Sequence, residues 1–359
     1  MRSNDNLTIN MMQALYGDAI HVRYFGTDNQ FHNIFIDGGF PVRTYRATIR
    51  HQTQQVLNSN ELIDLFIITH IDQDHIGGVL AFVKEFGSKD IVDAYWFNDS
   101  STPIKITPPS SKIGVRQGIE LREYLSANSL QTPIAITSDL GKIQLPGGAT
   151  ATILAPRPDD LMLFQKKWEN EEAKQNRKKN KIGASVNDYH MSIEVLIERP
   201  FAEDRKLVNK VSISFIFRLG ASSILFLADS QPSTIIHALR GLGYSEAKPL
   251  KVDHVKVAHH GSKHNTNTEL LTLIDSRSFL ISANGNNPYN FPHKELLARI
   301  LRHPNRSLDK PIEFIFNYDN AMLRSIFTAE EQKKLNFSCH FPPHGTNGYT
   351  IHCNTQQHD

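Results

Sequence analysis

The sequence predicts an α/β protein in which helices cover the faces of β-sheets. Two observations carry this prediction: strand-like apolar runs pair early in the chain, and helix-like and strand-like segments then alternate. The chain has 359 residues, of which 40 % are hydrophobic, so it can bury one large core or two modest ones. We expect a single domain over residues 1–359, with a charged insertion at about 157–186.

The individual elements follow from apolar periodicity, taken in chain order. Strands are expected where short apolar runs stand between turn-forming residues, at 62–68, 150–154, 192–197 and 224–228. Helices are expected where apolar residues recur with helical spacing, at 42–57, 76–86, 115–125, 232–242, 268–274 and 293–301. A Pro-Ser-rich stretch at 102–112 is expected to be a simple connection.

The most informative stretch directly follows the apolar run 62–68. His70, Asp72, Asp74 and His75 lie within six residues, and two glycines follow that give the backbone room to turn. Histidine nitrogens and carboxylate oxygens hold zinc or manganese while leaving coordination positions open for water and substrate. We therefore interpret the segment as half of a two-metal hydrolase site, carried on the loop beyond a buried strand.

This motif resembles the first metal motif of the metallo-β-lactamase fold, in its His-x-Asp-x-Asp-His form. Other segments are similar to the ComEC-type branch of that fold, the DNA-uptake nucleases and their stand-alone relatives, and they occur in the expected order: 17–22, 34–39, the apolar strand 224–229, the His-His-Gly-Ser segment 255–262, and the late elements 281–285 and 288–293. The resemblance implies an αββα sandwich, two sheets face to face with helices outside and the metals at one edge.

The resemblance also implies two divalent ions, zinc or manganese, and a set of ligands. One ion would be held by His70, Asp72 and His190, the other by Asp74, His75 and one of His259 or His260, with Asp229 bridging both. His260 is preferred over His259 because it directly precedes Gly261, as in the usual His-Gly turn of the fold. The mixed nitrogen and oxygen set shifts the choice of metal somewhat toward manganese, and zinc stays fully compatible.

The third ligand motif departs from the family pattern, which places asparagines and then a serine at the head of an apolar strand. Here the predicted strand 192–197 is preceded by His190, which is the expected ligand. Asn187 and Asp188 stay as alternative oxygen donors, and His190 could instead cap the strand. Asp37, in an Asp-Gly-Gly segment, is expected to orient ligands or shape a turn rather than bind metal.

Such a site suits the hydrolysis of phosphodiesters, because two metals yield a hydroxide for in-line attack and steady the developing charge. No protein nucleophile is evident. By resemblance, Ser262 and His293 would contact a phosphate or the leaving oxygen, and Asp74 would hold the second ion. The expected function is a metal-dependent phosphodiesterase, a DNase acting on single strands or ends. The alternatives are a small-molecule metallohydrolase of phosphodiesters or lactones, and an effector component of a larger defence assembly.

The charge pattern leaves the partner open. A net charge of +2 neither demands nor excludes a polyanion. A basic stretch from Lys166 to Lys181 could track a phosphate backbone, with Trp168 stacking on a base, although glutamates within it favour a solvated helix. DNA is the expected partner, with a protein partner as a second expectation. Two cysteines and the lack of a signal segment favour the cytoplasm, and no apolar run is long enough for a membrane span.

Overall fold

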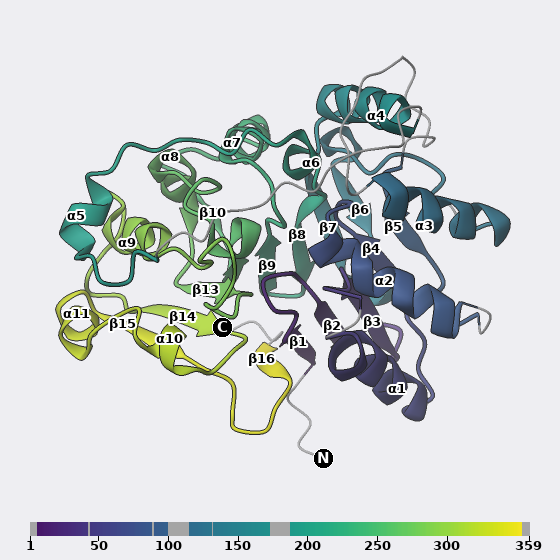
Figure 1. Ribbon diagram of the computed structural model, residues 1–359, viewed down its shortest axis with the longest axis horizontal. Helices are drawn as coiled ribbons and strands as arrows, with labels where there is room; N and C mark the ends of the chain where they lie inside the picture. The colour runs from purple at the N-terminus through teal and green to yellow at the C-terminus, as the bar shows by residue number, and fades with distance from the viewer. Residues whose placement is uncertain are drawn as a thin grey trace.

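Two β-sheets packed face to face form the centre of the molecule, and helices cover both outer faces (Figure 1). The computed structural model describes residues 6–41, 44–87, 90–99, 115–130, 132–172 and 187–353. The basic residues at 174–181 and the whole stretch 102–112 therefore lie outside the described residues.

The first sheet is built mainly from the N-terminal part of the chain. Its strand order is β16 (Gly348–Cys353), β1 (Leu7–Met12), β2 (Ile20–Phe25), β3 (Phe31–Ile36), β4 (Leu65–Ile68) and β5 (Tyr95–Phe97). The pairs from β16 to β3 are antiparallel, whereas β3, β4 and β5 run parallel. The C-terminal strand thus returns to complete a sheet that the first residues of the chain begin.

The second sheet carries the rest of the strands. Its order is β15 (Phe337–His340), β14 (Ile312–Phe316), β13 (Ser278–Ile281), β11 (His254–Lys256), β9 (Ser222–Phe226), β8 (Ser214–Leu219), β7 (Thr150–Ala155) and β6 (Lys142–Gln144). The strands from β9 to β15 are parallel, and those from β6 to β9 are antiparallel. Two short strands, β10 (Leu250–Lys251) and β12 (Ile274–Asp275), form a separate parallel pair.

The helices fall into two groups, one for each sheet. The first sheet is covered by a π-helical turn (Arg46–Arg50) and by α1 (His51–Asn58), α2 (Gln73–Phe86), α3 (Val115–Ala127), α4 (Pro158–Glu172) and α6 (Leu207–Lys210). The second is covered by α5 (Ile193–Ile197), α7 (Pro232–Gly241), α8 (Thr268–Thr272), α9 (Lys294–Arg302), α10 (Ala321–Arg324) and α11 (Ala329–Lys334). Short 3-10 turns occupy Ser138–Leu140, Pro146–Gly148 and Ala258–Gly261.

Three separate hydrophobic cores show how these layers hold together. Side chains alternate along each strand, so Ile67 of β4 and Phe215 of β8 meet between the sheets, while Phe66 faces the first helix group and Leu225 the second. Each core therefore fills one interface of a four-layer molecule. The predicted fold class, α/β with the four layers of an αββα sandwich, is confirmed.

The prediction of a strand at 192–197 is wrong, because these residues form α5. The Ser192 side chain accepts a hydrogen bond from the Val195 backbone N–H and so caps the helix. Ile193 and Leu196, three residues apart, are buried with α9 in the core beneath the second sheet. The buried residues of this segment therefore recur with helical spacing, and its β-branched residues, which favour strands, do not determine its secondary structure.

The expected insertion at 157–186 is partly a core element. Helix α4 packs on α3 and α6, and its Leu161, Phe164 and Trp168 are buried in the core between the helices and the first sheet. Trp168 is 1 % exposed and contacts the ring of Phe97, so the idea that it stacks on a base is wrong. None of the helices in the described ranges is long and apolar enough to cross a bilayer.

Candidate metal centre

The predicted ligands lie at one edge of the sandwich, just beyond the ends of strands from both sheets. In the first sheet, Asp37 follows β3 and His70 follows β4, and these strands are parallel. In the second, β9 and β11 are parallel with Phe226 opposite Lys256, so that Asp229 and His259 each lie three residues beyond a paired strand end. Both halves of the chain therefore deliver side chains to the same place.

The loop after β4 runs directly into α2. Asp72 takes the N-cap position, but its carboxylate accepts no capping hydrogen bond, and Asp74 lies in the first turn. Gly78 lets the helix approach the preceding turn, because a Cβ there would lie 1.9 Å from the carbonyl oxygen of Gly38. The helix start therefore presents both carboxylates, where its positive end favours negative charge.

The turn after β11 has an unusual backbone. His259 and His260 have φ angles of 48° and 54°, in the left-handed region that residues other than glycine rarely adopt. The turn is held by two hydrogen bonds, from the His259 N–H to the Ala228 carbonyl at 2.7 Å and from the Ser262 N–H to the His259 carbonyl at 2.9 Å. This strained conformation brings both adjacent imidazoles to Asp229.

Asp229 lies at the centre of the cluster, with four histidine Nε2 atoms around it. On one side, Oδ1 lies 3.4 Å from His75 and 3.5 Å from His260; on the other, Oδ2 lies 3.5 Å from His259 and 3.7 Å from His70. His260 Nε2 also lies 3.6 Å from Asp74 Oδ2. The carboxylate thus divides the histidines into two pairs, one on each oxygen.

The other ring nitrogen of each histidine faces a polar group that orients the ring. The Nδ1 distances are 2.7 Å from His75 to Asp37, 2.9 Å from His259 to Asn265, 3.0 Å from His70 to Thr69, and 3.5 Å from His260 to Asp18. Asp37 also accepts hydrogen bonds from the Thr69 N–H and hydroxyl. Where Nδ1 donates to such an oxygen, Nε2 keeps its lone pair and points at Asp229.

These residues fit a bound cation. The Nε2 atoms of His75 and His260 are 3.1 Å apart, so two lone pairs face each other if both rings are neutral. His70 Nε2 and Asp229 Oδ1 are buried without a hydrogen-bond partner among the described residues. Buried polar atoms are rarely left in that state, and imidazole and carboxylate donors suit zinc or manganese.

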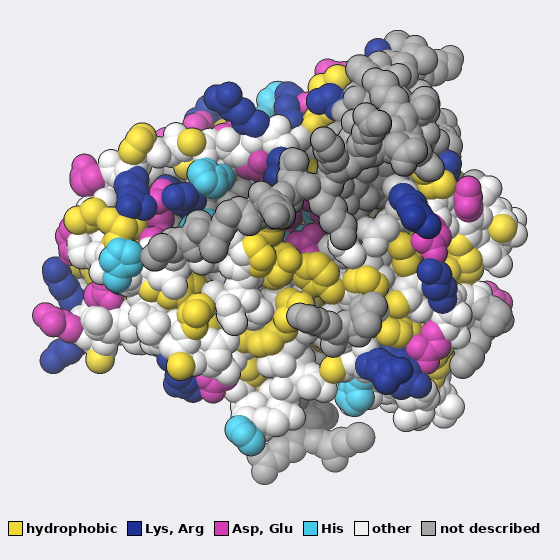
Figure 2. Space-filling view, viewed as in Figure 1, with side chains coloured by type: hydrophobic (Ala, Val, Ile, Leu, Met, Phe, Trp, Pro, Cys, Tyr) yellow, Lys and Arg dark blue, Asp and Glu magenta, His cyan; other side chains and the backbone are white. Residues whose placement is uncertain are grey.

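The charges of the cluster lead to the same conclusion. Burial alone would raise the pKa of Asp229, but the surrounding histidines hold it well below its ordinary value. Burial and the neighbouring Asp74 raise the pKa of Asp72 to about 7. Figure 2 shows acidic and histidine side chains near the centre of this face, beside a band of hydrophobic side chains. The edge of the sandwich is therefore a site of concentrated negative charge, which favours a cation.

Two residues of the cluster were missed by the sequence analysis. Lys256 is 1 % exposed, and its ammonium donates to Asp18 Oδ2 at 2.6 Å, while Asp18 Oδ1 faces His260. Asp18 is also one of four buried residues, with His75, Asp229 and His260, whose polar atoms all lie within 4.8 Å of one another. The available signal was a lysine inside the apolar run Val255–Val257, because a buried lysine is almost always paired.

The structure does not bring His190 to the cluster. Its side chain is exposed and, within the described ranges, makes no hydrogen bond or ion pair with the residues around Asp229. Of the alternatives, Asp188 accepts hydrogen bonds from the backbone N–H groups at the start of α9, both at 2.9 Å. Asn187 accepts the Tyr189 N–H at 3.3 Å. The segment therefore serves the N-terminus of α9.

Ser262 and His293 lie close to the cluster but face other groups. The Ser262 hydroxyl is buried and accepts the His264 N–H at 3.2 Å. His293 Nδ1 accepts the Lys263 N–H at 3.3 Å, and its ring contacts that of Phe291. Phe291 also packs on His259 and His260, so its ring lies between His293 and these two histidines of the cluster.

Comparison with known proteins gives short segments of similarity. No protein-family model matches the chain. A segment of 59 residues, 16 % of the chain, is 41 % identical to ComE operon protein 3 of Bacillus subtilis, and 84 residues, 23 % of the chain, are 32 % identical to Recombination protein 2 of Haemophilus influenzae. These matches cover only 8 % and 10 % of the two proteins.

Solved structures are similar over most of the chain, but at low scores. They include CmlA, a diiron β-hydroxylase from Streptomyces venezuelae (14 % identity, TM-score 0.41, 98 % of this chain and 54 % of that one) and a long form RNase Z from yeast (13 %, 0.41, 94 % and 44 %). A diphosphatase from the PhnP family matches at 12 % identity and TM-score 0.38, over 96 % and 97 % of the two chains. At these scores the fold assignment rests on the layers, the strand order and the three cores.

Proposed function

We propose that this protein is a metal-dependent phosphodiesterase that acts on nucleic acid, DNA in particular, with two divalent ions held on either side of Asp229. One observation carries the proposal: the two oxygens of this buried carboxylate each face a separate pair of histidine Nε2 atoms. A bridging carboxylate between two sets of ligands is the arrangement that two-metal hydrolases need.

The proposed ligand set follows from these pairs. His75, His260 and Asp74 would hold one ion, and His70, His259 and Asp72 the other, with Asp229 shared. His259 thus takes the place that the sequence analysis gave to His190. Zinc and manganese both suit this set, because it mixes nitrogen with carboxylate oxygen.

The chain's own residues would position and insulate the chemistry. Bound ions would act as Lewis acids on a phosphoryl oxygen and supply a nucleophilic water at neutral pH. Asp37 and Asn265 fix the orientation of the His75 and His259 rings. The ring of Phe291, 5 % exposed, covers His259 and His260 and keeps bulk water from them.

A matched pair of variants tests the ligand set. His259→Ala should lower the metal content of the saturated protein from two ions per chain to about one, because it removes one ligand of the second pair. His190→Ala should leave the content and the hydrolysis rate nearly unchanged. Elemental analysis after gel filtration measures the ions. The reverse ranking would return His190 to the site, and a folded protein that binds no ion at saturating metal would refute the two-metal proposal.

The reaction class is tested with bis-p-nitrophenyl phosphate, whose hydrolysis reports on the metals alone. The purified protein loaded with manganese or zinc should release p-nitrophenol, and Asp74→Asn should abolish this release while the protein stays folded. Hydrolysis of lactones or carboxylic esters, with no turnover of the phosphodiester, would instead favour a small-molecule hydrolase.

The nucleic-acid part of the proposal is supported by the motif resemblance and by the short similarity to a protein named Recombination protein 2. Contacts with several phosphates should make binding of single strands weaken steeply with salt, with a log-log slope of roughly −0.7 per phosphate contacted. Replacing Lys174, Arg177, Lys178 and Lys179 with serine should flatten that slope and spare bis-p-nitrophenyl phosphate. Equal loss on both substrates would mean that this stretch supports the fold.

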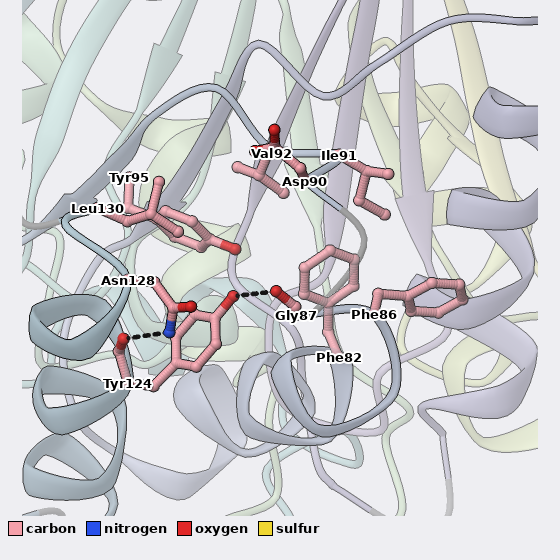
Figure 3. A pocket seen from close by; sticks show the side chains of 10 residues that line it. All are labelled: Phe82, Phe86, Gly87, Asp90, Ile91, Val92, Tyr95, Tyr124, Asn128 and Leu130. Carbon is pink, nitrogen blue, oxygen red and sulfur yellow. Dashed lines mark hydrogen bonds between the residues drawn. The ribbon is translucent and has the colours of Figure 1, made fainter.

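A cavity elsewhere in the molecule bears on the small-molecule alternative. A cavity of about 240 Å³ lies between α2, α3 and β5, lined by aromatic residues including Phe82, Phe86, Tyr95 and Tyr124 (Figure 3). Phe86 is eleven residues along α2 from His75, which is roughly 17 Å at 1.5 Å per residue. This cavity therefore cannot hold a substrate against the metal centre, and it gives the small-molecule alternative no support.

A cytoplasmic location stays part of the proposal. It is supported by the low cysteine content, since Cys339 and Cys353 are both free thiols, and burial raises the pKa of each to about 12. Thiols with so high a pKa are poor nucleophiles for disulfide exchange. Localisation of a tagged full-length protein by cell fractionation tests this point.

A further inference from the structure

Lys206 is held next to the candidate metal centre by its backbone. It is the N-cap residue of α6; its N–H donates to Asp204 Oδ1 at 2.9 Å, and its carbonyl accepts from the Gln231 side chain at 3.2 Å. Asp204 is itself tied to Asn265, the residue that orients His259, at 3.3 Å, and Gln231 lies two residues after Asp229. The anchor of the lysine is thus built from the residues that support the cluster.

The Lys206 ammonium faces the cluster without forming an ion pair. Within the part of the chain that the structure describes, no carboxylate oxygen lies within 4.0 Å of its Nζ, and the residue is exposed. Burial of its inner part acts to lower its pKa, but Asp72 and Asp204 outweigh that effect and raise the pKa. A charged amine is therefore kept at the edge of a carboxylate cluster, and it stays available to another anion.

An aromatic stack lies beside this amine. The Tyr289 ring centroid is 5.8 Å from Lys206 Nζ, and the ring stacks on Phe291 at 5.3 Å with an interplanar angle of 17°. Tyr289 is 36 % exposed, whereas Phe291 is buried against His259 and His260. The stacked rings thus extend from the surface to His259 and His260, two of the proposed ligands. The Tyr289 ring stays exposed to solvent beside the cluster.

We propose that Lys206 contacts a non-bridging phosphate oxygen of the substrate, and that the exposed ring of Tyr289 packs against the group attached to that phosphate. This inference rests on the proposed function and narrows it to anionic phosphodiesters with an aromatic substituent, such as a nucleotide. The physical reason is charge: once cations satisfy the carboxylates of the cluster, the unpaired ammonium is left as the anion-binding group at the mouth.

The test compares an anionic with a neutral substrate. Lys206→Met should lower kcat/KM for bis-p-nitrophenyl phosphate ~10-fold or more, the loss expected for one hydrogen bond to a charged group. It should change kcat/KM for the neutral triester diethyl p-nitrophenyl phosphate less than ~3-fold, since no charge is lost there. Lys206→Arg should recover most of the loss. Lys248→Met, at an exposed lysine on the connection between α7 and β10, is the matched control and should change neither substrate.

A binding measurement makes the test independent of turnover. With the metal-loaded protein and a labelled phosphorothioate oligothymidylate, which resists hydrolysis, fluorescence anisotropy should show a clear loss of affinity for Lys206→Met and for Tyr289→Ala, and little for Lys248→Met or Tyr289→Phe. Unchanged affinity and unchanged diester kinetics for Lys206→Met would overturn the inference, as would equal losses on diester and triester. If the unmodified protein hydrolyses no phosphodiester at all, the proposed function fails instead, and the anisotropy series alone judges Lys206.

Discussion

Histidines and aspartates lie at both ends of the parallel pair β3 and β4, but their hydrogen bonding differs between the two ends. At the start of the strands, His32 and Asn33 meet Asp64; at their ends, Asp37 and His70 join the cluster around Asp229. In the first group, which we call the closed end, the side chains satisfy one another's hydrogen bonds. Asp64 accepts from His32 at 2.6 Å and from the Asn33 N–H at 2.7 Å, and no side-chain atom of this group is buried without a partner.

The opposite end, around Asp229, has buried polar atoms without hydrogen-bond partners, and we call it the open end. His70 Nε2, Asp229 Oδ1, Asp18 Oδ1 and His260 Nδ1 are all buried without a hydrogen-bond partner in the described ranges, although the residue types are the same. Of these four residues, His70 follows β4, whereas the other three come from elsewhere in the chain. A closed group of this kind stabilises a fold, whereas open buried donors and acceptors cost stability unless a ligand satisfies them. The comparison therefore separates a group whose hydrogen bonds are satisfied from one whose hydrogen bonds are not, and four changes would test what each group contributes.

The largest effect is expected for Asp229→Asn at the open end. Loss of the shared carboxylate charge should lower kcat/KM for a phosphodiester on the order of 10³-fold, as for removal of a group that stabilises the transition state electrostatically. Metal content should fall with it. The melting temperature of the metal-free protein should fall only together with the metal content, because the surrounding histidines stabilise the charged form of Asp229 and its loss removes that contribution. A fall in that temperature, with metal content retained, would show that the open end is structural.

The converse change is Asp64→Ala at the closed end. It leaves His32 and the Asn33 N–H without their partner, so the free energy of unfolding should fall by ~3 kcal/mol, in the range for breaking a buried polar network. Urea denaturation of the metal-free protein measures this. At 25 °C the kcat/KM of the folded variant should stay within about threefold of the unmodified protein, since Asp64 does not contact the cluster. A loss of metal affinity would contradict the division between the two ends.

Asp37→Asn tests the link between β3 and the open end. Asp37 orients His75 and binds Thr69, so its loss should weaken metal affinity ~10- to 100-fold, as for other residues that orient metal ligands. Titration against a competing chelator measures the affinity. Asp28→Asn, at the exposed partner of His32, serves as the control and should leave it unchanged. Equal affinities for both variants would remove Asp37 from the site.

The smallest expected effect concerns pH at the closed end. Burial alone would lower the pKa of His32, but hydrogen bonds to Asp64 and Asp28 raise it above its ordinary value of about 6.5. The charged ring therefore contributes stability that is fully present below pH ~6.5 and is lost as pH rises through the folded-state pKa. Denaturation should show a larger stability gap between the unmodified protein and His32→Gln at pH ~5.5 than at pH ~9. A gap that widens with pH would mean that His32 is neutral in the fold.

The sequence was informative where the chemistry is local. The ligands from His70 to His75 are close neighbours, so their spacing alone indicated a metal site, and the resemblance of the later motifs implied that Asp229 would join them. Alternating helix-like and strand-like segments predicted sheets covered by helices, and the resemblance implied the four layers. The edge at which the site lies follows from parallel strands, whose ends meet on one side.

The parts that could not be predicted depend on contacts between distant residues. Asp18 and Lys256 are 238 positions apart, so the apolar residues around Lys256 indicate a buried, paired lysine but do not identify Asp18 as its partner. The choice between His259 and His260 has no answer in the sequence, because two consecutive left-handed residues direct both rings to Asp229. The segment 192–197 has strand-like composition, but a serine cap and packing on α9 decide for a helix.

The pairing of β16 with β1 has a consequence for the order of events during synthesis. Residues 7–12 leave the ribosome first among the strands, yet their partner at 348–353 leaves more than three hundred residues later. Until then β1 has only β2 beside it, and one of its edges stays open to pairing with another chain. The first sheet thus closes only after residues 348–353 have been made, and until then the free edge of β1 is a place where another chain could add a strand.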